Sequence, residues 1–243
     1  MDALIVGAGT MGRWFAGVID EPGTTLAFAD LDPEVAREAA ETFGGEAVAS
    51  DADDRFDLIC LAVPIPAIEA AVERYAPLAR SAIVDCSGVM SAPVDAMAEH
   101  APDRERASLH PLFAPENAPG NVAIVDEDGP LVTGLRERLE ERGNTLVETT
   151  PEEHDRAMET IQTKAHAAVL AFALAAEEVP EGFETPISAG LDDLVDRVTD
   201  GSPHVYADIQ ATFEGAEAVA DAAARIAEAD REAFEALYRE AGR

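Results

Sequence analysis

The sequence predicts a doubly wound α/β fold with a mainly parallel sheet, followed by an all-helical C-terminal domain. Short β-rich runs alternate with helical patterns between residues 3 and 126. Such alternation is typical of a parallel sheet with helices on both faces. A glycine-rich turn also joins the first predicted strand to the first predicted helix. After residue 150 the β-rich runs stop and only helical patterns remain.

Seven strands are expected, in the order ALIVG, TLAFAD, FDLICLAVP, AIVDCS, ASLHPLF, NVAIVD and TLVETT. Thr150 can then cap a helix, because Pro151 suits its first position and Glu153 completes a capping box. This helical pattern extends to about residue 178, and further helices are expected over about 187–199 and 203–241. We therefore predict two domains, 1–149 and 150–243.

The composition indicates a folded protein with a strongly acidic surface. The chain has 49 acidic and 17 basic residues, a net charge of -32, and 47% hydrophobic residues. The acids are dispersed among periodic apolar positions, which favours solvated faces over a disordered tail. Such a surface repels nucleic acid and anionic membranes. At about 1 M salt the screening length falls to about 3 Å, so the pattern resembles that of proteins from salt-in halophiles.

The chain also predicts a cytoplasmic location. No run approaches the 18 uncharged apolar residues of a membrane span, and Met1 leads directly into an apolar strand without a basic flank or cleavage site. Cys60 and Cys86 accompany apolar runs, so we expect buried thiols in a reducing compartment. No metal site is predicted.

The glycine-rich turn has the pattern of a dinucleotide-binding Rossmann domain. Gly7, Gly9 and Gly12 form G-x-G-x-x-G directly between a strand and a helix, the setting in which this pattern is specific. The three glycines permit the tight turn, the approach of the pyrophosphate, and close packing of helix on strand. Thr10 and Met11 begin the helix, whose N-terminal amides can bind phosphate.

Further cofactor contacts are expected at the carboxyl ends of the next strands. Asp30 ends the second strand 21 residues after Gly9, where an acid can bind both ribose hydroxyls and repel a 2'-phosphate. We therefore expect NAD in preference to NADP, with Asp32 as the competing acid. Val63 and Pro64 end another strand at the edge where open α/β sheets bind ligands.

Three further segments narrow the prediction. They read SLHPLFAPE (108–116), EEHDRAMETIQTKAH (152–166) and DRVTDGSPHVYADI (196–209). With the GAGTMG turn, their order and spacing resemble the prephenate dehydrogenase family over nearly the whole chain. The resemblance implies NAD-dependent oxidative decarboxylation of prephenate to 4-hydroxyphenylpyruvate, in tyrosine biosynthesis. It also implies a homodimer formed through the helical domain.

The resemblance assigns roles to individual residues. It makes His110 the catalytic histidine, a role that suits an imidazole held extended before a proline at a strand end. Gln162 and His166, four apart on one helix face, match positions that border the substrate pocket. Arg197 matches a later family arginine and is a candidate for the substrate carboxylates. We assign His154 and the neighbouring Asp155 to fixing the start of their helix.

Two departures from the family pattern keep alternatives open. The family serine that binds the catalytic histidine is displaced, and Ser87 is expected to substitute for it. An arginine that binds a substrate carboxylate in many members is missing from 188–190, which read Ser-Ala-Gly. Arogenate dehydrogenase is therefore the nearest alternative. Another Rossmann oxidoreductase and a non-catalytic dinucleotide sensor are the more distant ones.

Overall fold

The computed structural model describes residues 1–127, 129–180 and 182–242. The chain divides into two compact units, Met1–Asp155 and Arg156–Arg243. This division lies a few residues beyond the predicted boundary after Thr149. The reason is that the first turn of the following helix belongs to the first unit, where Asp155 accepts hydrogen bonds from the backbone amides of Met90 and Ser91 at 2.9 and 3.0 Å.

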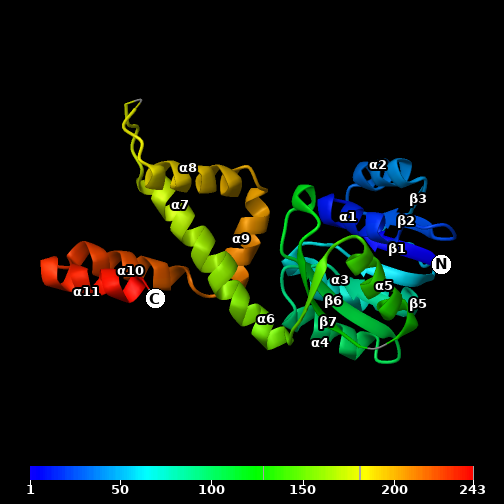
Figure 1. The fold of residues 1–243 in the computed structure, drawn as a ribbon. Coiled ribbons are helices and arrows are strands. Elements are labelled where there is room, and N and C mark those ends of the chain that lie inside the picture. The colour runs from blue at the N-terminus through cyan, green and yellow to red at the C-terminus, as the bar shows by residue number, and fades with distance from the viewer. Residues whose placement is uncertain (128, 181, 243) are drawn as a thin grey trace. The chain divides into compact units, whose positions relative to one another are not determined.

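The first unit is built on one sheet of eight strands (Figure 1), in the spatial order β3-β2-β1-β4-β5-β6-β7-β8. Every neighbouring pair is parallel except β6 and β7, which are antiparallel. The seven predicted strands are present, and β3 is an addition of two exposed residues. The strands are β1 (Asp2–Val6), β2 (Thr25–Ala29), β3 (Glu46–Ala47), β4 (Phe56–Leu61), β5 (Ala79–Asp85), β6 (Glu105–Pro111), β7 (Asn121–Asp126) and β8 (Thr145–Glu148).

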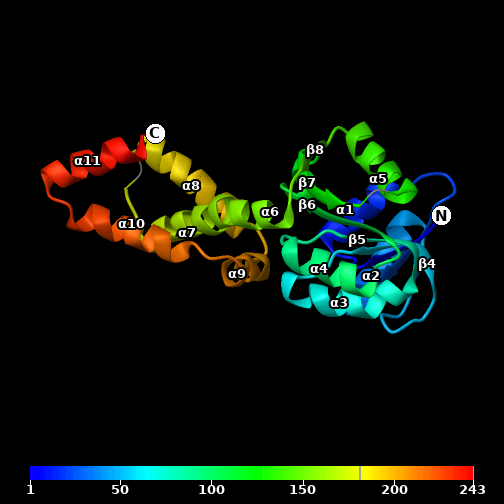
Figure 2. The same ribbon diagram turned by 90° about the horizontal axis from the view of Figure 1, so that it is seen from below.

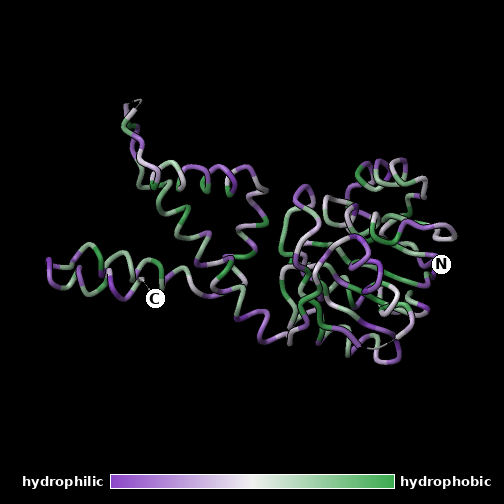
Figure 3. The backbone as a smooth tube through the Cα atoms, in the orientation of Figure 1, coloured by the Kyte–Doolittle hydropathy of each residue, from purple (hydrophilic) through white to green (hydrophobic). Residues whose placement is uncertain are grey.

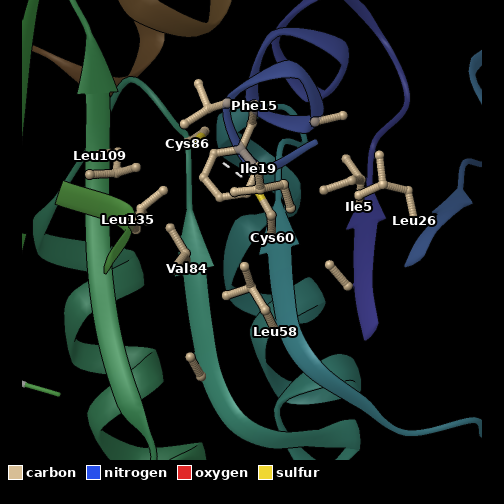
Figure 4. Close-up of a cluster of buried hydrophobic side chains, with 14 of the residues drawn as sticks. Ile5, Phe15, Ile19, Leu26, Leu58, Cys60, Val84, Cys86, Leu109 and Leu135 are labelled. Carbon is tan, nitrogen blue, oxygen red and sulfur yellow. Dashed lines mark hydrogen bonds between the residues drawn. The ribbon is translucent and has the colours of Figure 1, made fainter. Parts of the chain in front are cut away.

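Helices cover both faces of the sheet, as the alternation predicts (Figure 2). The main core lies on the face covered by α1 (Thr10–Ile19), α2 (Pro33–Phe43) and α5 (Pro130–Glu141). There Phe15 and Ile19 of α1 pack over the central strands (Figure 4). The opposite face carries α3 (Ile68–Tyr75) and α4 (Ser91–His100), which contact β4 and β6. The fold is therefore a Rossmann-type sheet with its order reversing between β1 and β4.

The second unit is helical in its described residues. A helix begins at α6 (Pro151–Met158), continues through a π-helical segment (Glu159–Lys164) and ends as α7 (Ala165–Ala175). The predicted cap is present, since Thr150 Oγ1 accepts from the amide of Glu153 at 3.2 Å. The following helices are α8 (Pro186–Thr199), α9 (Pro203–Thr212), α10 (Ala216–Glu228) and α11 (Arg231–Ala241).

The predicted helical stretch over 203–241 is thus three helices. Gly215, with φ of 137°, precedes α10 in a conformation that side chains other than hydrogen disfavour. Asp230 then caps α11 by accepting from the amide of Ala233 at 2.9 Å. The helical apolar pattern is therefore interrupted at Gly215 and at Asp230, where a positive φ and a helix cap begin a new helix.

The expectation for the two cysteines is confirmed. Cys60 and Cys86 are buried free thiols, with their sulfur atoms 3.8 Å apart. Among the described residues, no helix is long and apolar enough to cross a membrane. Figure 3 colours the chain by the hydropathy of each residue, and most helices carry both hydrophilic and hydrophobic residues. The sequence of α7, AHAAVLAFALA, is by contrast predominantly apolar.

The acidic residues lie on the surface. Within the described ranges, Asp85 is the one carboxylate that is buried. With a net charge of -32, exposed carboxylates repel one another wherever solvent ions do not screen them. The screening length is about 30 Å at 0.01 M salt and about 3 Å at 1 M, so the repulsion acts across the domain only at low salt.

We therefore expect the melting temperature to rise by at least about 10 °C between about 10 mM and 1 M KCl. Circular dichroism melts in the two buffers measure this. Sucrose at matched osmolality is the control, because it stabilises compact states without screening charge. Equal melting temperatures at both KCl concentrations would rule out the halophile-like interpretation.

Candidate active site

The glycine turn is held by two close backbone approaches. Gly7 has φ of 87°, and a Cβ added there would lie 2.2 Å from the carbonyl oxygen of Ala62. A Cβ on Gly12 would lie 1.9 Å from the carbonyl oxygen of Gly7. A Cβ on Gly9 would meet nothing within 4 Å. Gly7 and Gly12 are therefore required by the fold, whereas Gly9 leaves open space at the start of α1.

The start of α1 fits a phosphate group. Gly9 is its N-cap residue and supplies no side-chain cap, and its first turn, opened by Thr10 and Met11, contains no acidic residue. The first amides of a helix lack partners within the helix and attract anions. The donors and the space above Gly9 are thus those that a pyrophosphate needs.

The two acids after β2 have different structural roles. Asp30 Oδ2 accepts from the amide of Ala8 at 2.8 Å, which ties the carboxylate to the glycine turn. Asp32 is instead the N-cap of α2, where its Oδ1 accepts from the amide of Glu34 at 2.9 Å. Because Asp32 serves this cap, Asp30 is the acid that the structure places beside the turn.

The segments after β4, β5 and β6 converge at the same edge of the sheet. Val63 and Pro64 follow β4 directly and precede a short 3-10 turn, Ile65–Ala67. A Cβ added to Gly88, after β5, would lie 3.5 Å from Ile65 Cδ1 and 3.8 Å from the Nε2 atom of His110. The carboxyl edge of the sheet therefore brings the imidazole of β6 beside the backbone expected to border the cofactor.

His110 lies at the end of a chain of three side chains. Its Nδ1 atom is 2.8 Å from Nε2 of His154, and Nδ1 of His154 is 2.8 Å from Oδ1 of Asp155. Both imidazoles are buried, at 8% and 3% exposure. Asp155 in turn accepts from the amides of Met90 and Ser91 at the start of α4. The catalytic candidate is thus connected to fixed backbone donors.

Burial keeps His110 neutral. It lowers the pKa of His110 to about 3, with a further lowering by His154 and a smaller opposing effect of the Asp155 carboxylate. A neutral imidazole can accept a proton, as a general base must. The arrangement therefore supplies a base that is unprotonated at neutral pH.

Ser87 has a different partner from the one expected. Its Oγ atom lies 2.6 Å from Oδ2 of Asp85 and 2.9 Å from the carbonyl oxygen of Val89. Burial raises the pKa of Asp85 to about 6, although hydrogen bonds from Ser87 favour the ionised form. The Ser87 hydroxyl therefore holds the loop after β5 in place, where the resemblance implied a bond to His110.

A cavity of about 790 Å³ lies along α1. The charged side chains in its wall are Arg13 and Arg142, and Trp14 adds an aromatic surface. It includes Gly9 and Thr10 of the fingerprint. In a chain with 49 acidic residues, a wall charged only by arginines favours an anionic occupant.

The remaining site residues predicted from the sequence lie in the second unit. Gln162 is part of the π-helical segment, a distortion that is frequent at functional sites. The His166 ring contacts Tyr206 edge-on at 4.7 Å between centroids, and its Nδ1 atom is buried without a hydrogen-bond partner among the described residues. Arg197 is exposed in the last turn of α8.

His154 and Asp155 are the residues whose position in the site the sequence did not reveal. The sequence predicts that both fix the start of their own helix. Asp155 does accept from backbone amides, but at the start of α4. His154 is 44 residues from His110 in the chain, so no local spacing links the two. The sequence feature that could have placed them in the site is their position at the start of the helix motif that resembles the family.

Together, these features define a Rossmann domain of the dinucleotide-binding class, with a buried imidazole at the carboxyl edge of its sheet. Residues 15–126 match the model of the prephenate dehydrogenase nucleotide-binding domain. A 4-amino-4-deoxyprephenate dehydrogenase of Streptomyces pristinaespiralis is 32% identical, over 98% of this chain and 88% of that protein. A probable arogenate/prephenate dehydrogenase of Methanocaldococcus jannaschii is 24% identical, over 86% of this chain and 51% of that protein. The chain belongs to the prephenate dehydrogenase family.

Solved structures share the fold. The prephenate dehydrogenase of A. aeolicus, in complex with hydroxyphenyl propionate and NAD+, superimposes with a TM-score of 0.74 at 20% identity, covering 99% of this chain and 92% of that one. Synechocystis arogenate dehydrogenase has a TM-score of 0.64 at 19% identity, covering 99% and 97%. The predicted Rossmann domain with a helical C-terminal part is thereby confirmed.

Replacing two glycines separates the fold from dinucleotide binding. Gly12→Ala should destabilise the protein by more than about 3 kcal/mol, because its Cβ meets backbone that cannot move aside. Gly9→Ala should keep the wild-type melting temperature and weaken NADH binding by at least about tenfold, or 1.4 kcal/mol. Thermal melts and calorimetric titration with NADH measure the two effects. Unchanged NADH affinity in Gly9→Ala would contradict the proposed pyrophosphate position.

Proposed function

We propose that the protein is an NAD-dependent prephenate dehydrogenase, which converts prephenate to 4-hydroxyphenylpyruvate with loss of carbon dioxide. The observation that carries the proposal is the buried, neutral His110 beside the segments after β4 and β5, on a domain with a complete dinucleotide turn. The reaction needs both parts: a base for the hydroxyl proton and a bound hydride acceptor. When bound, the nicotinamide cofactor supplies that acceptor.

The chain's own residues divide the remaining tasks. His110 takes the proton of the ring hydroxyl, so that a ketone can form at that carbon as its hydride leaves. Asp30 binds the adenosine ribose and Gly7, Gly9, Thr10, Met11 and Gly12 form the pyrophosphate turn. Val63 and Pro64 border the cofactor, and Ser87 holds the neighbouring loop. We assign substrate binding to Gln162, His166 and Arg197. The Nδ1 atom of His166 supports its assignment, because it is buried with no hydrogen-bond partner in the described part of the chain.

A second candidate substrate is 4-amino-4-deoxyprephenate, which carries an amine where prephenate carries its ring hydroxyl. It is favoured by the Streptomyces relative, which is 32% identical over 98% of this chain. Arogenate, with an amino acid side chain, is a third candidate. The residues at 188–190 bear on that choice, because Ser188 caps α8 with Thr185 and no arginine is present there.

We also propose a homodimer formed through the helical unit. Among the described residues, α7, α8, α10 and α11 have no fully buried side chain. Large apolar side chains are exposed on α7, on α8 and in the loop between them, including Leu174, Phe183 and Ile187 at 75% or more. Such a surface is typical of one that a partner covers. The molar mass measured by light scattering in molar KCl tests the proposal, and a monomer would contradict it.

A panel of two cofactors and three substrates tests the function. We expect the purified protein in about 1 M KCl to reduce NAD with prephenate, and to use NAD better than NADP by at least about tenfold in kcat/KM. Absorbance of the reduced cofactor follows each reaction. Turnover of 4-amino-4-deoxyprephenate or arogenate alone would replace the proposed substrate. Equal use of NADP would remove the assignment of Asp30.

Replacing His110 tests the mechanism. His110→Asn should lower kcat by at least about 100-fold, because a positioned base contributes about 10² to 10⁴ in rate. NADH binding should stay unchanged, since the glycine turn and Asp30 are intact. With the pKa of His110 at about 3, the wild-type loss of kcat/KM due to its protonation should begin well below pH 6, and the variant should lack that loss.

His100→Asn is the matched control, because His100 is exposed at the end of α4. It should have wild-type kinetics throughout. Wild-type kcat in His110→Asn would contradict the mechanism while leaving the family assignment in place.

A further inference from the structure

The hydrogen bonds that link Asp155, His154 and His110 have fixed donors and acceptors. Asp155 accepts from the backbone amides of Met90 and Ser91 at 2.9 and 3.0 Å, and a backbone amide can only donate. Burial raises the pKa of Asp155, but the hydrogen bonds from His154 and the start of α4 outweigh it and lower that pKa overall. Asp155 is therefore an ionised acceptor.

This anchor determines the protons on both imidazoles. Nδ1 of His154 faces the Asp155 carboxylate at 2.8 Å, so it carries a hydrogen. When His154 carries only this one hydrogen, its Nε2 is an acceptor. Nδ1 of His110, 2.8 Å away, must then be the donor. The lone pair of His110 lies on Nε2, the atom nearest to Gly88 at the ligand-binding edge of the sheet.

We propose that His154, supported by Asp155, is a positioning residue that holds His110 in the tautomer with its proton on Nδ1 and its lone pair on Nε2. The catalytic part of this inference rests on the proposed function. As the substrate O–H bond breaks, its proton bonds to Nε2 and its electron pair forms the ketone, while hydride passes from the ring carbon to the dinucleotide. The Nδ1–H bond stays intact throughout.

The same hydrogen-bonded residues, His154 and Asp155, stabilise the His110 imidazolium that proton transfer produces. A protonated His110 is a cation in a buried position, which is unfavourable without a partner. Its Nδ1–H still donates to His154, and the Asp155 carboxylate lies next along the chain. The acceptor on His154 and the negative charge of Asp155 are thus in place before the imidazolium forms. Catalytic groups of this kind are called preorganised.

Nitrogen NMR on protein labelled with ¹⁵N-histidine tests the tautomer directly. The chain has five histidines, and loss of one signal set in His110→Asn assigns His110. We expect wild-type His110 to carry its proton on Nδ1 and to lose this preference in His154→Ala. A wild-type proton on Nε2 would overturn the proposal. The measurement needs no substrate.

Kinetics then test whether the position matters for catalysis. His154→Ala should lower kcat by about 10- to 1000-fold, with smaller changes in KM and in NADH affinity. His154→Gln should recover part of kcat, because its amide oxygen can accept from His110 Nδ1. His100→Gln is the matched control on an exposed histidine. Wild-type kcat in His154→Ala, or a Gln variant no better than Ala, would contradict a positioning role.

The two experiments separate this inference from the proposed function. A wild-type protein that shows the Nδ1 tautomer but turns over none of the three substrates would refute the function alone. A protein that turns over prephenate with the proton of His110 on Nε2 would refute the inference alone.

Discussion

The carboxylate of Asp155 is the constraint on which the site depends. It joins the start of α4, the first turn of α6 and, through His154, the catalytic candidate on β6. Removing one partner from such a buried network leaves the others unsatisfied, at a cost of about 1–3 kcal/mol for each polar group. The same contact explains why the first compact unit extends to Asp155. The Asp155 carboxylate therefore supports both the packing of the first unit and the position of His110.

The charge of the protein sets a second constraint. A chain with a net charge of -32 must still bind an anionic dinucleotide and, under the proposed function, a substrate with carboxylates. Long-range repulsion is screened by salt, whereas contacts at van der Waals distance are much less affected. In the first unit, the groups that can attract anions locally are the uncapped amides at the start of α1 and the cavity wall, whose charged residues are Arg13 and Arg142. Binding of anions can thus coexist with an acidic surface.

The sequence was sufficient for the features that local chemistry determines. Seven strands follow from β-rich runs, and the roles of Gly7 and Gly12 follow from the fingerprint, because tight backbone approach requires glycine at those positions. It could not reveal contacts between residues far apart in the chain. His154 reaches His110 across 44 residues. Ser87 instead bonds Asp85, two residues before it, in place of the bond to His110 that the resemblance implied. The π-helical segment at Gln162 likewise has no signal in a pattern that reads as continuous helix.

The chemistry of His110 limits which substrates the site suits. A neutral imidazole with its lone pair on Nε2 accepts a proton from a group that becomes acidic as the reaction proceeds. A ring hydroxyl does so when its carbon loses hydride, and a ring amine in the same position does so as well. His110 therefore does not by itself discriminate between prephenate and 4-amino-4-deoxyprephenate. The distinction must come from groups that recognise the hydroxyl or amine by hydrogen bonding, since a site built to bond one such group rejects the other strongly.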